Sequence, residues 1–227
     1  MSHPFTARRG IALFAAVALM LMAPLVRAQS EQQELVAKAE TTLQNFLRAP
    51  EMTWLQQNIS RAKAVLVAPE IFKAGFIFGG SGGRALLLAH DSGTGQWRGP
   101  AFYTLATASV GFQAGILVSE NVTLVMTDKG LNSLLAPSVK LGGDASIAAG
   151  PVGAGAAADV TTDFLSFARS KGVYGGLNLD GTLISVNNDW NNAYYAKSVL
   201  PPDILLRGNV SNPAATNLLA IIAKPRP

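Results

Sequence analysis

The sequence contains no cysteine, and only two of its 227 residues are histidine. The absence of cysteine excludes disulfide bonds, thiol catalysis and metal sites with thiolate ligands. The aspartate residues are scattered without calcium-loop spacing, and one histidine beyond the N-terminal region is too little for a zinc site. The sequence therefore predicts neither a metal ion nor a cofactor, and stability must come from the burial of apolar side chains.

Charged residues are also scarce, at 14% of the chain, and the net charge is +4. Three of the 18 basic residues, Arg8, Arg9 and Arg27, lie in residues 1–28, which contain no acidic residue. The remainder of the chain is therefore nearly neutral, and it has no cluster of Lys and Arg. We accordingly expect no nucleic-acid partner, because such binding relies on a basic surface.

Residues 1–28 have the pattern of a secretory signal peptide. Two arginines precede an apolar run at residues 11–22, and Val26 and Ala28 place compact residues at the two positions that a signal peptidase reads. An uncleaved membrane anchor is the alternative, but the run is short for a span and Pro24 interrupts it. We expect cleavage near Ala28 and a periplasmic or secreted protein.

The remainder of the chain has the pattern of one domain. Residues 30–47 place apolar residues at helical spacing, and their polar face is too acidic to favour an anionic membrane, so we expect a helix docked on a sheet. In residues 63–114, short apolar runs alternate with Gly-rich breaks, including a hairpin loop at 91–95, as is typical of strands joined by tight turns. The predicted fold class is α+β: a single domain with a largely antiparallel twisted β-sheet and short helices packed on one side or end.

The densest break is the glycine segment, residues 79–83, with the sequence GGSGG. It matches the spacing of a nucleophile elbow around Ser81, but a hydrolase would need an acidic residue and then a histidine downstream, and no acidic residue separates Ser81 from His90. It also matches a dinucleotide fingerprint, but residues 85–89 are too short for the required helix. We interpret the segment as a tight turn, with head-group contact as the functional alternative, and predict no catalytic residue.

Several motifs, in a fixed order, carry a resemblance to a known family. They are KAVLV at 63–67, PEIFKAGFIFGGSGGR at 69–84, GPAFY at 99–103, SVGFQAG at 109–115, MTDKGL at 126–131, AGPVG at 149–153, FARSKG at 167–172 and Tyr194-Tyr195. Together they resemble the SYLF domain family, also called the Las17-binding-protein actin regulator domain. The resemblance extends over residues 35–206 and assigns 29–208 to a SYLF lipid-binding domain, with 209–227 as a C-terminal tail.

The resemblance implies a protein that binds acidic phospholipid and is not an enzyme. Eukaryotic members also bind actin and recruit endocytic partners, but actin is not expected as a partner of an exported protein, and a protein partner is not indicated. The predicted function is therefore non-catalytic binding of acidic phospholipid or a similar amphiphile in the cell envelope. The alternative is an envelope protein–protein interaction module without significant lipid binding.

An anionic head group needs cationic side chains and acyl chains need aromatic ones. The predicted lipid-binding residues are Lys63, Lys73, Phe76, Phe78, Arg84 and Arg98. If the glycine segment is a turn, Lys73 and Arg84 converge on one face, although a solvated hairpin would carry the same cations. Core packing is likewise the alternative for the two phenylalanines. Arg169 and Lys171, which bracket another predicted turn, form a second-choice patch.

Overall fold

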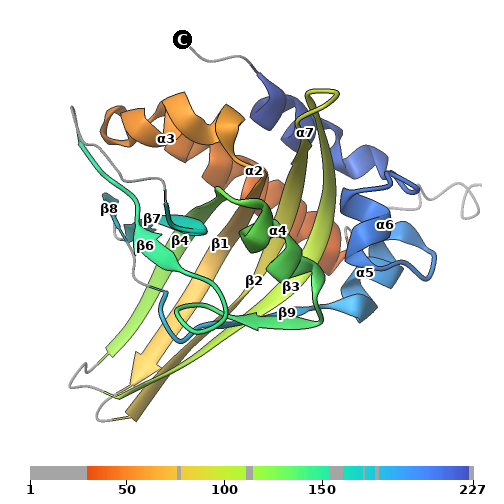
Figure 1. Ribbon diagram of the computed structural model, residues 1–227. Coiled ribbons are helices and arrows are strands. Elements are labelled where there is room, and N and C mark those ends of the chain that lie inside the picture. Colours follow the sequence, from red (N-terminus) through yellow and green to blue (C-terminus); the bar gives the residue numbers. More distant parts are fainter. Residues whose placement is uncertain are drawn as a thin grey trace, which may run out of the picture. The chain divides into compact units, whose positions relative to one another are not determined.

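Four long strands form the centre of the fold. They are β1 (Ala64–Gly75), β2 (Phe78–Asp91), β3 (Gln96–Val110) and β4 (Gly115–Val125). The computed structural model describes residues 30–75, 78–110, 115–153, 161–170, 172–176 and 179–224. Its compact unit, Glu31–Pro227, contains every helix and strand named below (Figure 1).

Five shorter strands extend the sheet on both sides. They are β5 (Ser138–Lys140), β6 (Ile147–Ala149), β7 (Phe164–Ser170), β8 (Val173–Gly176) and β9 (Leu183–Val186). The nine-stranded sheet has the order β5-β9-β3-β2-β1-β4-β7-β6, with β8 paired to β7. All pairs are antiparallel except β6 with β7. The predicted α+β class with a largely antiparallel sheet is confirmed.

The helices are short except for the first. They are α2 (Glu31–Arg48), α3 (Thr53–Asn58), α4 (Asp128–Leu135), α5 (Asn188–Tyr195), α6 (Pro201–Leu205) and α7 (Thr216–Ala223), with 3-10 turns η1 (Pro50–Met52), η2 (Ile59–Arg61) and η3 (Pro213–Ala215). The predicted helix at 30–47 is confirmed as α2, and its apolar stripe is buried, including Leu35, Leu43 and Phe46. None of the described helices has the length and apolar character needed to cross a membrane.

The two faces of the sheet carry separate apolar cores. One core joins side chains of α2, α3 and α7 to Val65, Leu86 and Phe102 of the long strands. The other joins side chains of α4, α6 and β5 to Leu66 and Leu87. Since neighbouring residues of a strand point to opposite faces, the run LLL in β2 supplies both cores. The helices leave one end of the long strands uncovered, and this end lies at the bottom of Figure 1.

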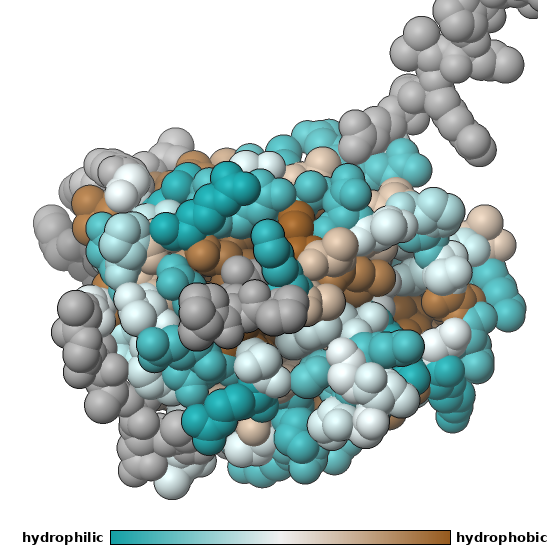
Figure 2. Space-filling model, turned by 90° about the horizontal axis from the view of Figure 1, so that it is seen from above, coloured by the Kyte–Doolittle hydropathy of each residue, from teal (hydrophilic) through white to brown (hydrophobic). Residues whose placement is uncertain are grey.

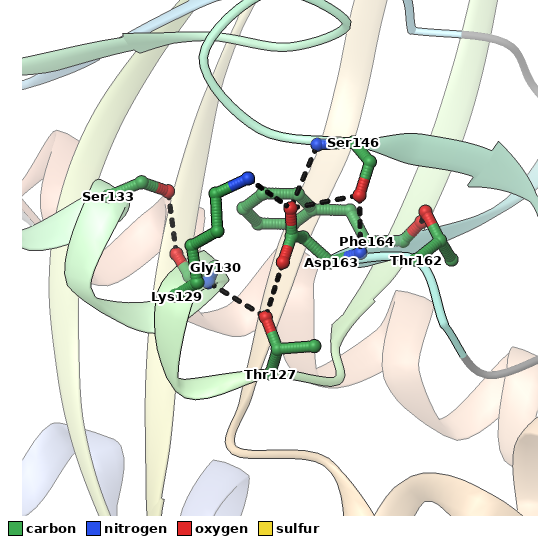
Figure 3. A network of polar contacts seen from close by, with 8 residues as sticks. All are labelled: Thr127, Lys129, Gly130, Ser133, Ser146, Thr162, Asp163 and Phe164. Atoms are coloured by element: carbon green, nitrogen blue, oxygen red, sulfur yellow. Dashed lines mark hydrogen bonds and ion pairs between the residues drawn. The ribbon is translucent and has the colours of Figure 1, made fainter.

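A buried carboxylate attaches α4 to the sheet (Figure 3). Asp163, at the start of β7, accepts hydrogen bonds from the Thr127 hydroxyl and from the amide and hydroxyl of Ser146, and it pairs with Lys129 at 3.3 Å. The Thr127 hydroxyl also accepts from the Gly130 amide, so Thr127 is the N-cap of α4. Burial alone would raise the pKa of Asp163, but these hydrogen bonds outweigh it and lower the pKa to about 2.

The predicted turn at the glycine segment is wrong, because residues 79–83 lie inside β2. The glycines instead allow the backbone of β2 to approach that of the neighbouring strand closely. β1 contains a bulge between Val67 and Glu70, and a Cβ on Gly83 would lie 2.4 Å from the Glu70 carbonyl oxygen. Glycine is the residue that allows such an approach. The hairpin loop predicted at 91–95 is confirmed between β2 and β3.

Candidate functional site

A groove of about 570 Å³ opens between the start of α2 and the glycine segment of β2. Gly82 and Gly83 line it without side chains, so backbone forms part of its surface. Leu35, Phe72 and Trp190 supply apolar surface to the lining. The combination of apolar and aromatic side chains with a side-chain-free strand leaves room for an elongated apolar group.

Arg84 is the cation placed most directly in this groove. It lies in β2 opposite Glu70 of β1 and Thr104 of β3. Its guanidinium carbon lies 4.1 Å from the centroid of the Trp190 ring, and its Nη1 atom is 3.5 Å from Glu31 Oε2. The side chain remains 50% exposed, so a phosphate could reach it while the stacking on tryptophan holds the guanidinium in place.

A second cation, Lys38 of α2, is neutralised by two carboxylates. Its Nζ atom lies 3.0 Å from both Glu34 Oε1 and Glu70 Oε2. The hydrogen bond to Glu34 and then that to Glu70 raise the pKa of Lys38. Three glutamates and two cations therefore line the groove, and an anionic ligand must compete with carboxylates that the protein already supplies.

Two of the predicted cations lie elsewhere. Lys63 pairs with Asp128 of α4 at 3.1 Å, at the start of β1. Arg98 pairs with Asp91 at 2.9 Å, and its guanidinium also donates to the Leu206 carbonyl. Arg98 lines a different pocket, of about 430 Å³, beside α6 and α7. The structure therefore does not gather the predicted cations into one site.

Lys73 and Arg84 do not converge, contrary to the expectation from the sequence. Lys73 is paired with Ser81, whereas Arg84 is paired with Glu70. Ser81 and Arg84 are separated by an odd number of positions in one strand, so their side chains point to opposite faces. The expectation fails because it depended on a turn where the strand in fact continues. Within the described part of the chain, Lys73 has no ion-pair partner.

The remaining predicted residues are only partly described. Phe76 and Lys171 lie outside the described residues, and Phe78 is described only as the backbone partner of Val110 in β3. Arg169 of the second-choice patch is paired with Glu120 and lies 5.7 Å from the centroid of the Tyr174 ring. This pairing gives Arg169 a structural role in joining β4, β7 and β8.

Sequence reasoning missed Glu31, Lys38 and Trp190 as parts of the groove. In the sequence, Glu31 and Lys38 belong to the polar face of a helix that docks on a sheet, which indicates no binding site. Trp190 lies far along the chain in α5. Only the tertiary fold brings them beside Arg84. The described residues contain no group of three or more His, Asp or Glu side chains that could hold a metal ion.

Comparison with known proteins identifies the family of this α+β domain. Residues 106–224, more than half of the chain, match the family described as Las17-binding protein actin regulator, Ysc84. The chain belongs to this family, which confirms the resemblance seen in the motifs. No solved structure matches the chain.

Three relatives show the extent of the similarity. Protein YSC84 of Saccharomyces cerevisiae is 28% identical over 201 residues, which cover 83% of this chain and 42% of the relative. LAS seventeen-binding protein 3 of the same species is 27% identical over 201 residues, covering 83% and 43%. SH3 domain-containing YSC84-like protein 1 of Mus musculus is 29% identical over 161 residues, covering 69% and 46%. The chain thus spans less than half the length of each of these relatives.

Proposed function

We propose that residues 29–208 form a non-catalytic module that binds acidic phospholipid, with the groove beside α2 as its head-group site. The observation that carries the proposal is the stacking of Arg84 on Trp190 at the mouth of a groove lined by Gly82 and Phe72. A half-exposed arginine held by an aromatic ring suits a phosphate, and the apolar lining suits the first part of an acyl chain. The signal-peptide pattern of residues 1–28 supports a role in the cell envelope.

A second candidate is a protein–protein interaction module. The observation in its favour is that both cations of the groove already have carboxylate partners, which lowers their attraction for an anion. The name of one yeast relative also describes a LAS seventeen-binding protein, and the family is described as Las17-binding protein actin regulator. Actin itself does not suit an exported protein, so this candidate would require a different partner in the envelope.

Co-sedimentation with vesicles tests the proposal. The chain from Gln29 to Pro227 contains the compact unit and both apolar cores, so it is the appropriate sample. We expect it to sediment with vesicles of phosphatidylcholine and phosphatidylglycerol, and less with phosphatidylcholine alone, with binding falling as salt rises. Failure to sediment with either kind of vesicle would overturn the proposal and favour the interaction module.

A matched pair of variants tests the site. Arg84→Gln should lower binding to acidic vesicles by about fivefold, because one cation near an anionic surface contributes about 1 kcal/mol. Arg61→Gln is the control, since Arg61 is also exposed and, among the described residues, its side chain is hydrogen-bonded only to Asn58. Equal losses in both variants would indicate bulk charge and would remove the groove from the proposal.

A further inference from the structure

The uncovered end of the four long strands has an unusual composition. This distal sheet end comprises residues 72–75 of β1, 78–82 of β2, 106–110 of β3 and 115–118 of β4. It contains no carboxylate, and its single charged residue is Lys73. Glycine, alanine, serine and threonine make up most of the rest, so long stretches of strand have almost no side-chain bulk.

One face of the distal sheet end carries an apolar row that continues onto the neighbouring strand β9. The row runs Val118, Phe72, Gly82, Ala106 and Leu183 through successive strand partners. Phe72 is 53% exposed, Val118 44% and Leu183 43%. Phe72 and Gly82 also line the groove beside α2, so the row leads directly to Arg84, two residues further along β2.

The other face of the distal sheet end is more polar, but it also exposes an apolar side chain. Leu117 of β4 is 36% exposed. Its strand partner in β1 is Lys73, and the next partners across the sheet are Ser81 of β2 and Thr107 of β3. A globular protein or a second copy of this chain would cover one face of a sheet and leave the other in water. A lipid bilayer surrounds both faces of an inserted edge. The exposure of Val118 and Leu117 on opposite faces therefore favours a bilayer as the occupant.

Charge favours the same occupant. A surface without carboxylates meets no repulsion from anionic head groups, and Lys73 can extend its amine toward them while its methylene groups stay in the apolar layer. The opposite end of the molecule is different. Seen from above in Figure 2, it shows mainly hydrophilic residues, with hydrophobic ones in patches between them.

We propose that the distal sheet end inserts edge-on into the outer layer of a phospholipid bilayer, which places the groove and Arg84 at head-group level. This inference rests on the proposed function and adds the orientation of the bound protein. We expect shallow insertion, about 5–10 Å. Toward the end that inserts, β4 is paired with β7 only as far as Ser119, and β3 is paired with β9 only as far as Ala106. Beyond these residues the backbone groups on the outer edges of β3 and β4 lack strand partners among the described residues and need water or head groups.

Site-specific fluorescence tests the orientation, and the absence of native cysteine makes labelling unambiguous. Val118→Cys and Leu117→Cys report on the two faces, and Ser92→Cys, in the exposed β2–β3 loop at the other end of the strands, is the control. Each variant of the chain from Gln29 to Pro227 carries one environment-sensitive nitrobenzoxadiazole label. With vesicles of phosphatidylcholine and phosphatidylglycerol, we expect labels at 118 and 117 to brighten and to be quenched by shallow doxyl-lipids, whereas the label at 92 stays unchanged.

The outcomes separate this inference from the proposed function. If the protein sediments with vesicles but only the label at 118 responds, one face binds and insertion is wrong. If it sediments and neither label responds, the proposed function stands and this orientation falls. A dimer in solution whose labels respond without vesicles would identify a second copy as the occupant. No sedimentation at all overturns both proposals.

A substitution supplies an independent measure. Phe72→Ser should weaken partition into the same vesicles by about tenfold, because half of a phenylalanine surface leaves the apolar layer. Leu200→Ser is the matched control, since Leu200 is 56% exposed at the start of α6 and lies outside the distal sheet end. It should change partition by less than about twofold. Equal effects of the two variants would also overturn the inference.

Discussion

The two ends of the four long strands differ in side chains although the strands pair along their whole length. At the end near the β2–β3 loop, Val65, Leu86 and Phe102 are fully buried beneath helices. At the distal sheet end, the corresponding positions hold Phe72 and Gly82, and both are accessible to solvent. The covered end therefore supplies most of the apolar burial that stabilises the fold, whereas the distal end adds strand length with little burial.

This contrast shows that strand pairing and core formation are separate properties of the sheet. The pairing of β1 with β2 and with β4 continues to the last described residue of β1. Backbone hydrogen bonds contribute only modestly to net stability, so an end without a core needs support from the covered end. A stable core at one end allows the other end to expose apolar side chains such as Phe72.

The largest expected effect compares two phenylalanines, one at each end. Phe102→Ala should lower the free energy of unfolding by about 3–5 kcal/mol, because it leaves a cavity beneath α5 and α7 in a fully buried site. Phe72→Ala should lower it by less than about 1 kcal/mol, because Phe72 is mostly exposed. Urea unfolding of both variants measures the difference, and similar losses would show that the distal end also contributes to the core.

Substitutions of two neighbouring glycines test the backbone packing where the two ends of the strands meet. Gly83→Ala should destabilise the protein by about 2 kcal/mol, because the new Cβ would meet the Glu70 carbonyl in the β1 bulge and the backbone must shift. Gly82→Ala is the control, since its Cβ would lie 3.5 Å from the Leu105 carbonyl, an ordinary contact. Its effect on the urea midpoint should be small. If both variants unfold at the wild-type midpoint, the bulge is more adaptable than its geometry indicates.

The buried carboxylate of the covered end gives a pH test. The pKa of Asp163 is lowered to about 2, so its ionised form stabilises the fold fully above the pKa of an unfolded aspartate, about 4. This stability is lost as pH falls from about 4 through 2, and it amounts to about 2 kcal/mol. Asp163→Asn should reduce this part of the acid sensitivity and lower stability at pH 7. Thermal unfolding from pH 7 to pH 2 measures it, and parallel curves for wild type and variant would contradict it.

The sequence predicted the covered end better than the distal end, for a physical reason. Apolar spacing identified α2, and the turn residues at 91–95 identified a hairpin, because both signals are local. The turn predicted at the glycine segment was wrong because glycine permits both tight turns and close approach of strands. Only the bulge opposite Gly83 decides between the two. The strand register then decided that Lys73 and Arg84 face apart.

The candidate groove was even less predictable, since its parts come from α2, the long strands and α5. Arg84 was predicted because it lies in a family motif, but no local pattern links it to Glu31 or Trp190. Such a link depends on how the helices dock on the sheet. The composition of the distal end was nonetheless visible in the sequence as a glycine-rich region with few charges.

The smallest expected effect concerns the boundary between the two ends, where Glu31 pairs with Arg84. If Arg84 binds phosphate, Glu31 competes with the ligand, so Glu31→Gln should strengthen binding to acidic vesicles by about threefold. Glu51→Gln removes the same charge from the exposed turn η1, outside the groove lining, and is the control for net charge. Co-sedimentation at low salt compares the two, and the difference should shrink as salt rises. Weaker binding of Glu31→Gln would instead show that the carboxylate helps to hold Arg84 in its binding position.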